Sequence, residues 1–147
     1  MTAQPARPVA AEVAACRFTV KLIEDRREQT GLGTVVRTSV DGEGFSGWFA
    51  DGIHAIPGYA HDGAPIELRI EVLKAYIHSI ATMKSANLVV RVQLAADGAP
   101  LQVKTYRGVD SSTNWSSSES EIQITFDNAL NDLKLKMSAD IDRLCKR

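Results

Sequence analysis

The residues best suited to bind a ligand occupy two stretches of this sequence. They are Asp25, Arg27 and Gly33 in the first stretch, and Lys104, Tyr106 and Trp115 in the second. Cationic side chains beside glycine amides commonly bind carboxylates or phosphates. The glycine spacing matches neither a P-loop nor a dinucleotide fingerprint, so we predict an anion site of no recognised class between the 25–33 and 109–120 loops. The alternative for residues 25–33 is a solvated turn held by a surface ion pair.

No group of side chains has the spacing of a catalytic or metal site. His54, His61 and Asp62 are the one cluster of metal-ligand types, and they are not paired four residues apart on one element. No serine lies in a Gly-x-Ser-x-Gly context. Glu67 and Glu71 would lie roughly 13 Å apart on the outer face of a strand, too far to act as a glycosidase pair. We therefore expect a protein that is not an enzyme, with no catalytic residue, cofactor or metal.

The two cysteines, Cys16 and Cys145, lie near opposite ends of the chain. This separation excludes a zinc ribbon or a Cys-x-x-Cys redox motif. Both fall on the apolar phase of their elements, which predicts either two buried thiols or a disulfide that requires an oxidising compartment. Residues 13–16 also match the spacing of a lipoprotein cleavage box, although Glu12 interrupts the apolar segment that a signal peptide needs. Cys16 is therefore free, lipidated or bonded to Cys145.

Length and composition limit the classes of protein. The 147 residues include 17 basic and 18 acidic side chains, a net charge of -1, and 44% of them are hydrophobic. This balance gives no global attraction to nucleic acid, and the apolar runs are shorter than the roughly 20 residues of a transmembrane helix. We predict one α+β domain over residues 16–147, with no nucleic-acid partner and no transmembrane segment. Residues 1–15 read as a disordered lead-in or the remnant of a signal peptide.

Alternating apolar residues between positions 65 and 107 predict a three-stranded antiparallel meander. Residues 66–72 and 87–94 both have the period of two that a half-buried strand requires. Asp97 and Gly98 form a favoured two-residue hairpin turn. After residue 72 the apolar phase changes, which predicts a β-bulge near Leu73, unless Tyr76 and His78 keep the original phase and enter the core.

The remaining elements follow from periodicity and composition. We expect strands over residues 16–23 and 34–40, a short helix over 45–56, a polar loop over 109–120 and a long amphipathic helix over 118–147. Phe18, Val20 and Leu22 should face the core, and Ser118 with Glu121 should cap the long helix. The predicted fold class is α+β: an antiparallel sheet of four or five strands, in β-α-β-β-β-α order, with the C-terminal helix packed on one face.

The order of these features resembles the YajG-type family of uncharacterised bacterial lipoproteins. The matching positions are Asp25, Arg27, Gly33, Lys104, Tyr106 and Gly108, within a likeness that covers residues 16–147. The resemblance implies a periplasmic or outer-membrane-associated β-α-β-β-β-α domain. It supplies no catalytic residues, because the family has no established activity. If no signal lies upstream of this sequence, the expected location is the cytoplasm.

Three functional hypotheses follow. The first is a non-catalytic cell-envelope module that binds another envelope protein or a cell-wall component. The second is a small-ligand-binding or hydrolytic protein that holds an anion near the 25–33 and 109–120 loops. The third is a structural protein that oligomerises, for example as a homodimer, through an exposed edge strand.

Overall fold

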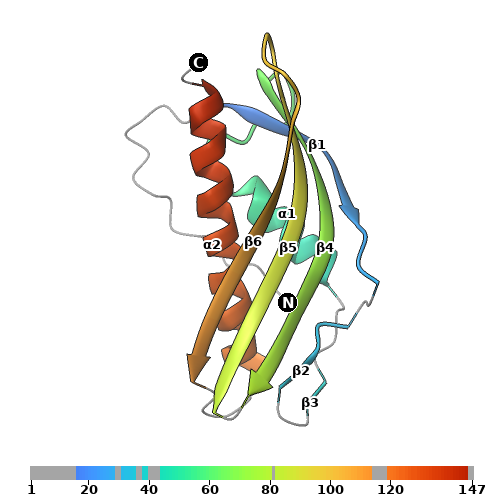
Figure 1. The fold of residues 1–147 in the computed structure, drawn as a ribbon, viewed down its shortest axis with the longest axis vertical. Helices are drawn as coiled ribbons and strands as arrows, with labels where there is room; N and C mark the ends of the chain where they lie inside the picture. The colour runs from blue at the N-terminus through green and yellow to red at the C-terminus, as the bar shows by residue number, and fades with distance from the viewer. Residues whose placement is uncertain are drawn as a thin grey trace.

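The computed structural model describes residues 16–28, 31–35, 38–39, 44–80, 82–113 and 119–145. In chain order the elements are β1 (Phe18–Asp25), β2 (Thr34–Val35), β3 (Thr38–Ser39), α1 (Phe45–His54), β4 (Ile66–Ile80), β5 (Met83–Ala96), β6 (Gln102–Thr113) and α2 (Glu119–Cys145). The fold is α+β, as the sequence predicts (Figure 1). The predictions for the lead-in over residues 1–15, for Trp115 and for the Ser118 cap lie outside the described residues.

The main sheet has the strand order β1-β4-β5-β6 and is mixed. The expectation of a wholly antiparallel sheet is wrong at β1, which pairs with β4 in parallel. The chain crosses over through α1 between these two strands and returns to the same end of the sheet, so both strands run in the same direction. The single strand expected over residues 34–40 is instead a small antiparallel pair, β2 and β3.

The meander itself is confirmed, including its two irregular points. The register of β4 against β5 shifts between Val72 and Lys74, which is the β-bulge predicted near Leu73. Beyond the bulge the side chains of Ala75 and Ile77 are buried, so the original phase is not kept. The Ala99 amide donates to the Ala96 carbonyl at 3.1 Å across the predicted hairpin turn.

Strand β1 contains a second irregularity that its sequence pattern does not indicate. Its register against β4 shifts between Val20 and Leu22. Phe18 is fully buried and Val20 packs against the core, as expected, but Leu22 is 41% exposed and Ile23 packs against the core in its place. The prediction that Leu22 faces inward is therefore wrong, because the extra residue reverses the alternation of side chains.

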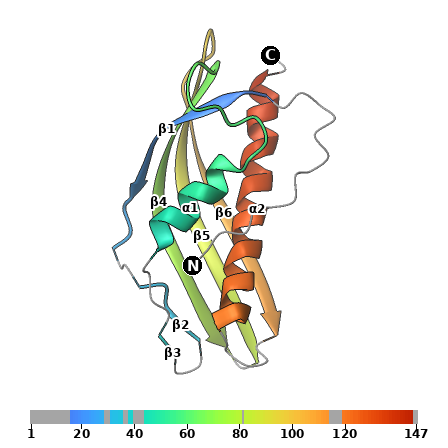
Figure 2. The same ribbon diagram turned by 180° about the vertical axis from the view of Figure 1, so that it is seen from behind.

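Both helices cover the same face of the sheet, as Figure 2 shows. The predicted apolar stripe of α2 is buried at Ile122, Phe126, Leu130, Leu133, Met137 and Ile141. The Trp48 ring of α1 meets Phe126 edge to face at 6.1 Å, and its indole nitrogen donates to Asp127 at 2.9 Å. None of the helices in the described part of the chain combines the length and the apolar character needed to cross a bilayer.

The third meander strand, β6, is longer than expected. Residues 109–113, predicted as loop, continue the strand and pair with β5 as far as Met83. Backbone pairing does not depend on apolar side chains, and polar ones suit this end of the sheet: the Ser111 hydroxyl donates to Ser85 at 3.0 Å. Gly108 lets α2 approach the strand, because a Cβ atom there would lie 2.8 Å from the Leu133 Cβ.

A disulfide joins the two ends of the described chain. Cys16 precedes β1 and Cys145 ends α2, and their Cα atoms are 5.9 Å apart across a sequence separation of 129. The bond ties the edge of the sheet to the last turn of the helix that covers it.

Candidate functional site

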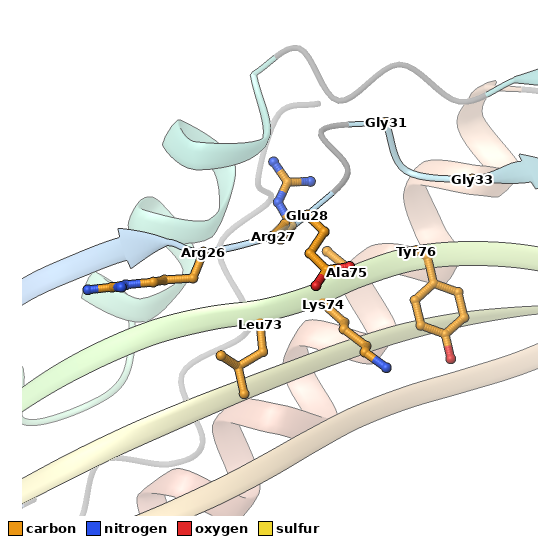
Figure 3. Close-up of a pocket in the computed structure, with 9 residues that line it drawn as sticks. All are labelled: Arg26, Arg27, Glu28, Gly31, Gly33, Leu73, Lys74, Ala75 and Tyr76. Carbon is orange, nitrogen blue, oxygen red and sulfur yellow. The ribbon is translucent and has the colours of Figure 1, made fainter.

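A pocket of about 590 Å³ lies at the edge of β4, where β1 ends (Figure 3). One wall is formed by residues 26–28 with Gly31 and Gly33, and the other by residues 73–76 of β4. The pocket therefore includes part of the predicted 25–33 site. It also includes the bulged segment of β4, whose residues are not among the predicted site residues.

The pocket exists because β1 leaves the sheet before β4 ends. The Arg26 amide donates to the Val72 carbonyl at 2.9 Å, and the next pairing of this segment is the Ile77 amide with the Leu32 carbonyl at 2.7 Å. Ala75 lies two residues before Ile77 on the same strand. Its N–H and C=O therefore point to the same edge of β4 as those of Ile77, into the space between these two hydrogen bonds. No backbone hydrogen bond joins Ala75 to the described part of residues 26–33.

Gly33 has a structural role at the far end of this interval. Its φ is 97°, and a Cβ atom there would lie 3.2 Å from the Ile77 nitrogen and closer still to the Ile77 oxygen. Only glycine allows this close approach without strain. The glycine that the sequence suggested as a source of anion-binding amides therefore closes one end of the pocket.

Asp25 and Arg27 form a structural clamp. Arg27 donates from Nε and Nη2 to the two carboxylate oxygens of Asp25, at 2.8 and 2.7 Å. Its guanidinium also lies 4.1 Å from the centre of the Phe45 ring, and only 5% of its side chain is exposed. The Arg27 side chain lowers the pKa of Asp25. This arrangement matches the ion-paired turn better than an anion site, and it fastens the end of β1 to α1.

The clamp gives a direct stability prediction. Arg27→Met should lower the free energy of unfolding by about 1 to 3 kcal/mol, because it removes both hydrogen bonds of the buried guanidinium to Asp25 and its contact with the Phe45 ring. Arg26→Met is the matched control, since that side chain is 59% exposed. Urea denaturation of both variants measures the difference, and equal effects would contradict the clamp.

Two charged side chains of the pocket remain uncommitted. Glu28 extends from the β1 side toward β4, and Lys74 projects from β4 (Figure 3). Both are exposed, and neither has an ion pair within the part of the chain that the structure describes. By contrast, Arg26 contacts Glu24 at 2.6 Å and Glu71 at 4.0 Å. The uncommitted charges of the pocket are thus one cation and one anion.

Lys104 and Tyr106 lie far from this pocket. They are on β6, which β4 and β5 separate from β1. The Tyr106 hydroxyl donates to Asp140 of α2 at 2.6 Å, and Lys104 lies 3.2 Å from the same carboxylate oxygen. The structure therefore splits the predicted site into a clamp at one edge of the sheet and a strand–helix contact at the other.

The Asp140 contact makes stability depend on pH. Burial opposes ionisation of Asp140, but hydrogen bonds from Tyr106 and Lys104 outweigh it and hold its pKa below the ordinary 3.8. Burial and Asp140 together raise the pKa of Tyr106. A carboxylate with a lowered folded pKa stabilises the fold above its ordinary pKa and loses this contribution as the pH falls through the folded value.

We therefore expect Asp140→Asn to reduce the fall in the free energy of unfolding between about pH 5 and pH 2. Asp142→Asn, at an exposed position two residues further along the same helix, is the control. Urea titrations at several pH values measure how steeply the free energy of unfolding changes with pH in both variants. A slope unchanged by Asp140→Asn would show that this contact does not contribute to acid sensitivity.

Comparison with known proteins identifies the fold and no family. No family model matches the chain, and no curated protein matches its sequence. Solved structures with a similar fold include a protein of Xanthomonas campestris assigned to family DUF330, at TM-score 0.55 and 12% identity over 93% of this chain and 87% of that one. A hypothetical protein of Chlamydia trachomatis has a TM-score of 0.56 and 9% identity, over 86% of this chain and 98% of that one. A candidate lipoprotein of Caulobacter crescentus has a TM-score of 0.53 and 11% identity, over 78% of this chain and 89% of that one.

At these identities the likeness extends to the fold alone. The YajG-type resemblance therefore stays a prediction.

Proposed function

We propose that this chain is a non-catalytic binding or assembly module of the bacterial cell envelope. The observation that carries the proposal is the bond between Cys16 and Cys145. Disulfides persist in oxidising compartments such as the periplasm and are rare in the reducing cytosol. The lipoprotein name of the similarly folded Caulobacter crescentus protein is consistent with the same compartment.

The bond also bears on how the module would be held in the envelope. A lipoprotein anchor is a thioether on the cysteine sulfur, and the sulfur of Cys16 is already bonded to Cys145. Our proposal therefore uses no lipid on Cys16. The clustering of uncommitted polar groups at the β4 pocket makes that pocket the favoured contact for a ligand or partner.

Cell fractionation tests this proposal. The protein, expressed from its own gene with whatever sequence precedes it, should appear in the periplasmic or outer-membrane fraction, and cross-linking there should recover a defined partner. Recovery in the cytoplasmic fraction would contradict the envelope assignment. A cytoplasmic marker enzyme measured in the same fractions controls for cell lysis.

Self-association through β6 is a second candidate function, favoured because side chains of α2 cap only part of the free edge of this strand. The Val109 amide donates to Asp132 at 3.0 Å, and Lys136 donates to the Arg107 carbonyl at 2.6 Å, so side chains of α2 cap this part of the edge. Val103 and Thr105 are in phase with these residues, and no described residue caps them in the same way. Val103 is 54% exposed. Uncapped edge groups are templates for pairing with another strand.

If the open part of β6 pairs with a second copy, Val103→Lys should abolish dimers, because like charges would face each other across the pair. Leu22→Lys, at an exposed apolar position on the opposite edge strand, is the control. Light scattering over a concentration series measures the dimer fraction. A wild-type protein that stays monomeric throughout would exclude this candidate.

A further inference from the structure

We propose that the β4 pocket binds the zwitterionic backbone of a short peptide. This inference rests on the proposed binding function and names its ligand class. It starts from the two uncommitted charges: Glu28 on the β1 side suits an ammonium group, and Lys74 on β4 suits a carboxylate. A zwitterion gains an attraction from each, whereas a simple anion is attracted by Lys74 and repelled by Glu28.

The arginines of the pocket do not restore a preference for anions. Arg27 is neutralised by both oxygens of Asp25, and Arg26 by Glu24. Their positive charge is therefore already balanced within the protein. The ligand sees a site of near-zero net charge with separated positive and negative groups, which is the electrostatic complement of a dipeptide.

The backbone of Ala75 supplies the second element of recognition. Its N–H and C=O point into the interval between the flanking bonds at Val72 and Ile77. Those two residues are about 16 Å apart along an extended strand, and a dipeptide spans about 7 Å, so an extended dipeptide is shorter than this interval. It would add a single rung to the sheet, as a bound strand does in β-augmentation.

The pocket walls set a modest size limit. The volume of about 590 Å³ lies within the usual range for small-molecule sites. Leu73 and Tyr76 provide apolar surface beside the charged groups, as Figure 3 shows. We therefore assign the site to peptides of two or three residues with small side chains and both termini free.

Titration with four probes, followed by the Ala75 amide signal in NMR, tests the ligand class. The probes are alanyl-alanine, its N-acetyl form, its C-terminal amide and inorganic phosphate. We expect alanyl-alanine to bind about two- to fivefold more tightly than either blocked form, because each terminus would lose one exposed ion pair, and phosphate to bind more weakly than all three. Equal affinity for alanyl-alanine and its acetyl form, tighter binding of phosphate, or no shift up to the solubility limit of the dipeptide would overturn the proposal.

Two variants assign each terminus to a side chain. In Glu28→Gln the advantage of alanyl-alanine over the acetyl form should disappear, while its advantage over the amide remains. Lys74→Gln should give the reverse pattern. Lys21→Gln and Glu67→Gln are the controls, since they change an exposed ion pair outside the pocket, 3.6 Å across. Unchanged preferences in Glu28→Gln and Lys74→Gln would overturn the assignment.

The peptide titration and the cell fractionation test separate claims. A failed titration would remove the peptide ligand and leave the compartment assigned by fractionation. A cytoplasmic location with a successful titration would contradict the envelope assignment and retain the binding site.

Discussion

Removing the disulfide with Cys16→Ser and Cys145→Ser should lower the free energy of unfolding by about 4 to 5 kcal/mol, the largest effect we expect from any change in this protein. The bond closes a loop across 129 positions of the chain. Without it the unfolded chain regains the conformational freedom that this loop denies, so the folded state loses its relative advantage. Urea denaturation of the double variant and of the wild type measures the loss.

The wild-type protein supplies its own control. Reduced wild type should unfold at the same urea concentration as the double variant, and adding reductant to the variant should change nothing. A wild-type midpoint that does not move on reduction would show that the bond contributes no stability.

Gly108→Val should lower the free energy of unfolding by at least about 3 kcal/mol, because it forces the helix away from the sheet. A Cβ atom at this position would lie 3.1 Å from the Leu133 nitrogen and closer to the carbonyl oxygen of Ala129, both on the backbone of α2. Neither backbone atom can rotate aside as the end of a flexible side chain can. The loss of burial along α2 adds to the steric cost.

Gly47→Ala is the matched control for this substitution. Gly47 lies on the exposed side of α1, and a Cβ atom there meets nothing within 4 Å. Alanine should therefore be neutral or stabilise the helix by about 0.5 to 1 kcal/mol. Thermal melts of both variants distinguish the positions, and a Gly108→Val protein as stable as wild type would contradict the packing of α2 on β6.

The elements that the sequence predicts well are those with a sustained period. The stripe from Ile122 to Ile141 specifies α2, and the change of phase after Val72 specifies the bulge in β4. The direction of β1 within the sheet is not predicted in this way, because the apolar pattern of a strand does not indicate whether its neighbour runs parallel or antiparallel. Its parallel pairing with β4 depends on the crossover through α1, and the slip after Val20 depends on the local fit of the two strands.

The candidate site was harder to predict because its parts are not adjacent in the sequence. The charges of Asp25 and Arg27 suggested ligand binding, yet each satisfies the other. Lys74 is one of several charged residues on the outer face of its strand, and it lines a pocket only because β1 ends beside it. The bulge at Leu73 was the available signal, since bulges often lie beside functional sites.

Trapping the cysteines in living cells shows whether Cys16 and Cys145 are bonded there. Cells of the organism that encodes this protein are quenched in acid, unfolded in denaturant, and treated with a thiol reagent that adds measurable mass. Our account predicts that neither Cys16 nor Cys145 gains the label unless the sample is first reduced. Labelling of both cysteines without reduction would contradict an oxidised envelope module.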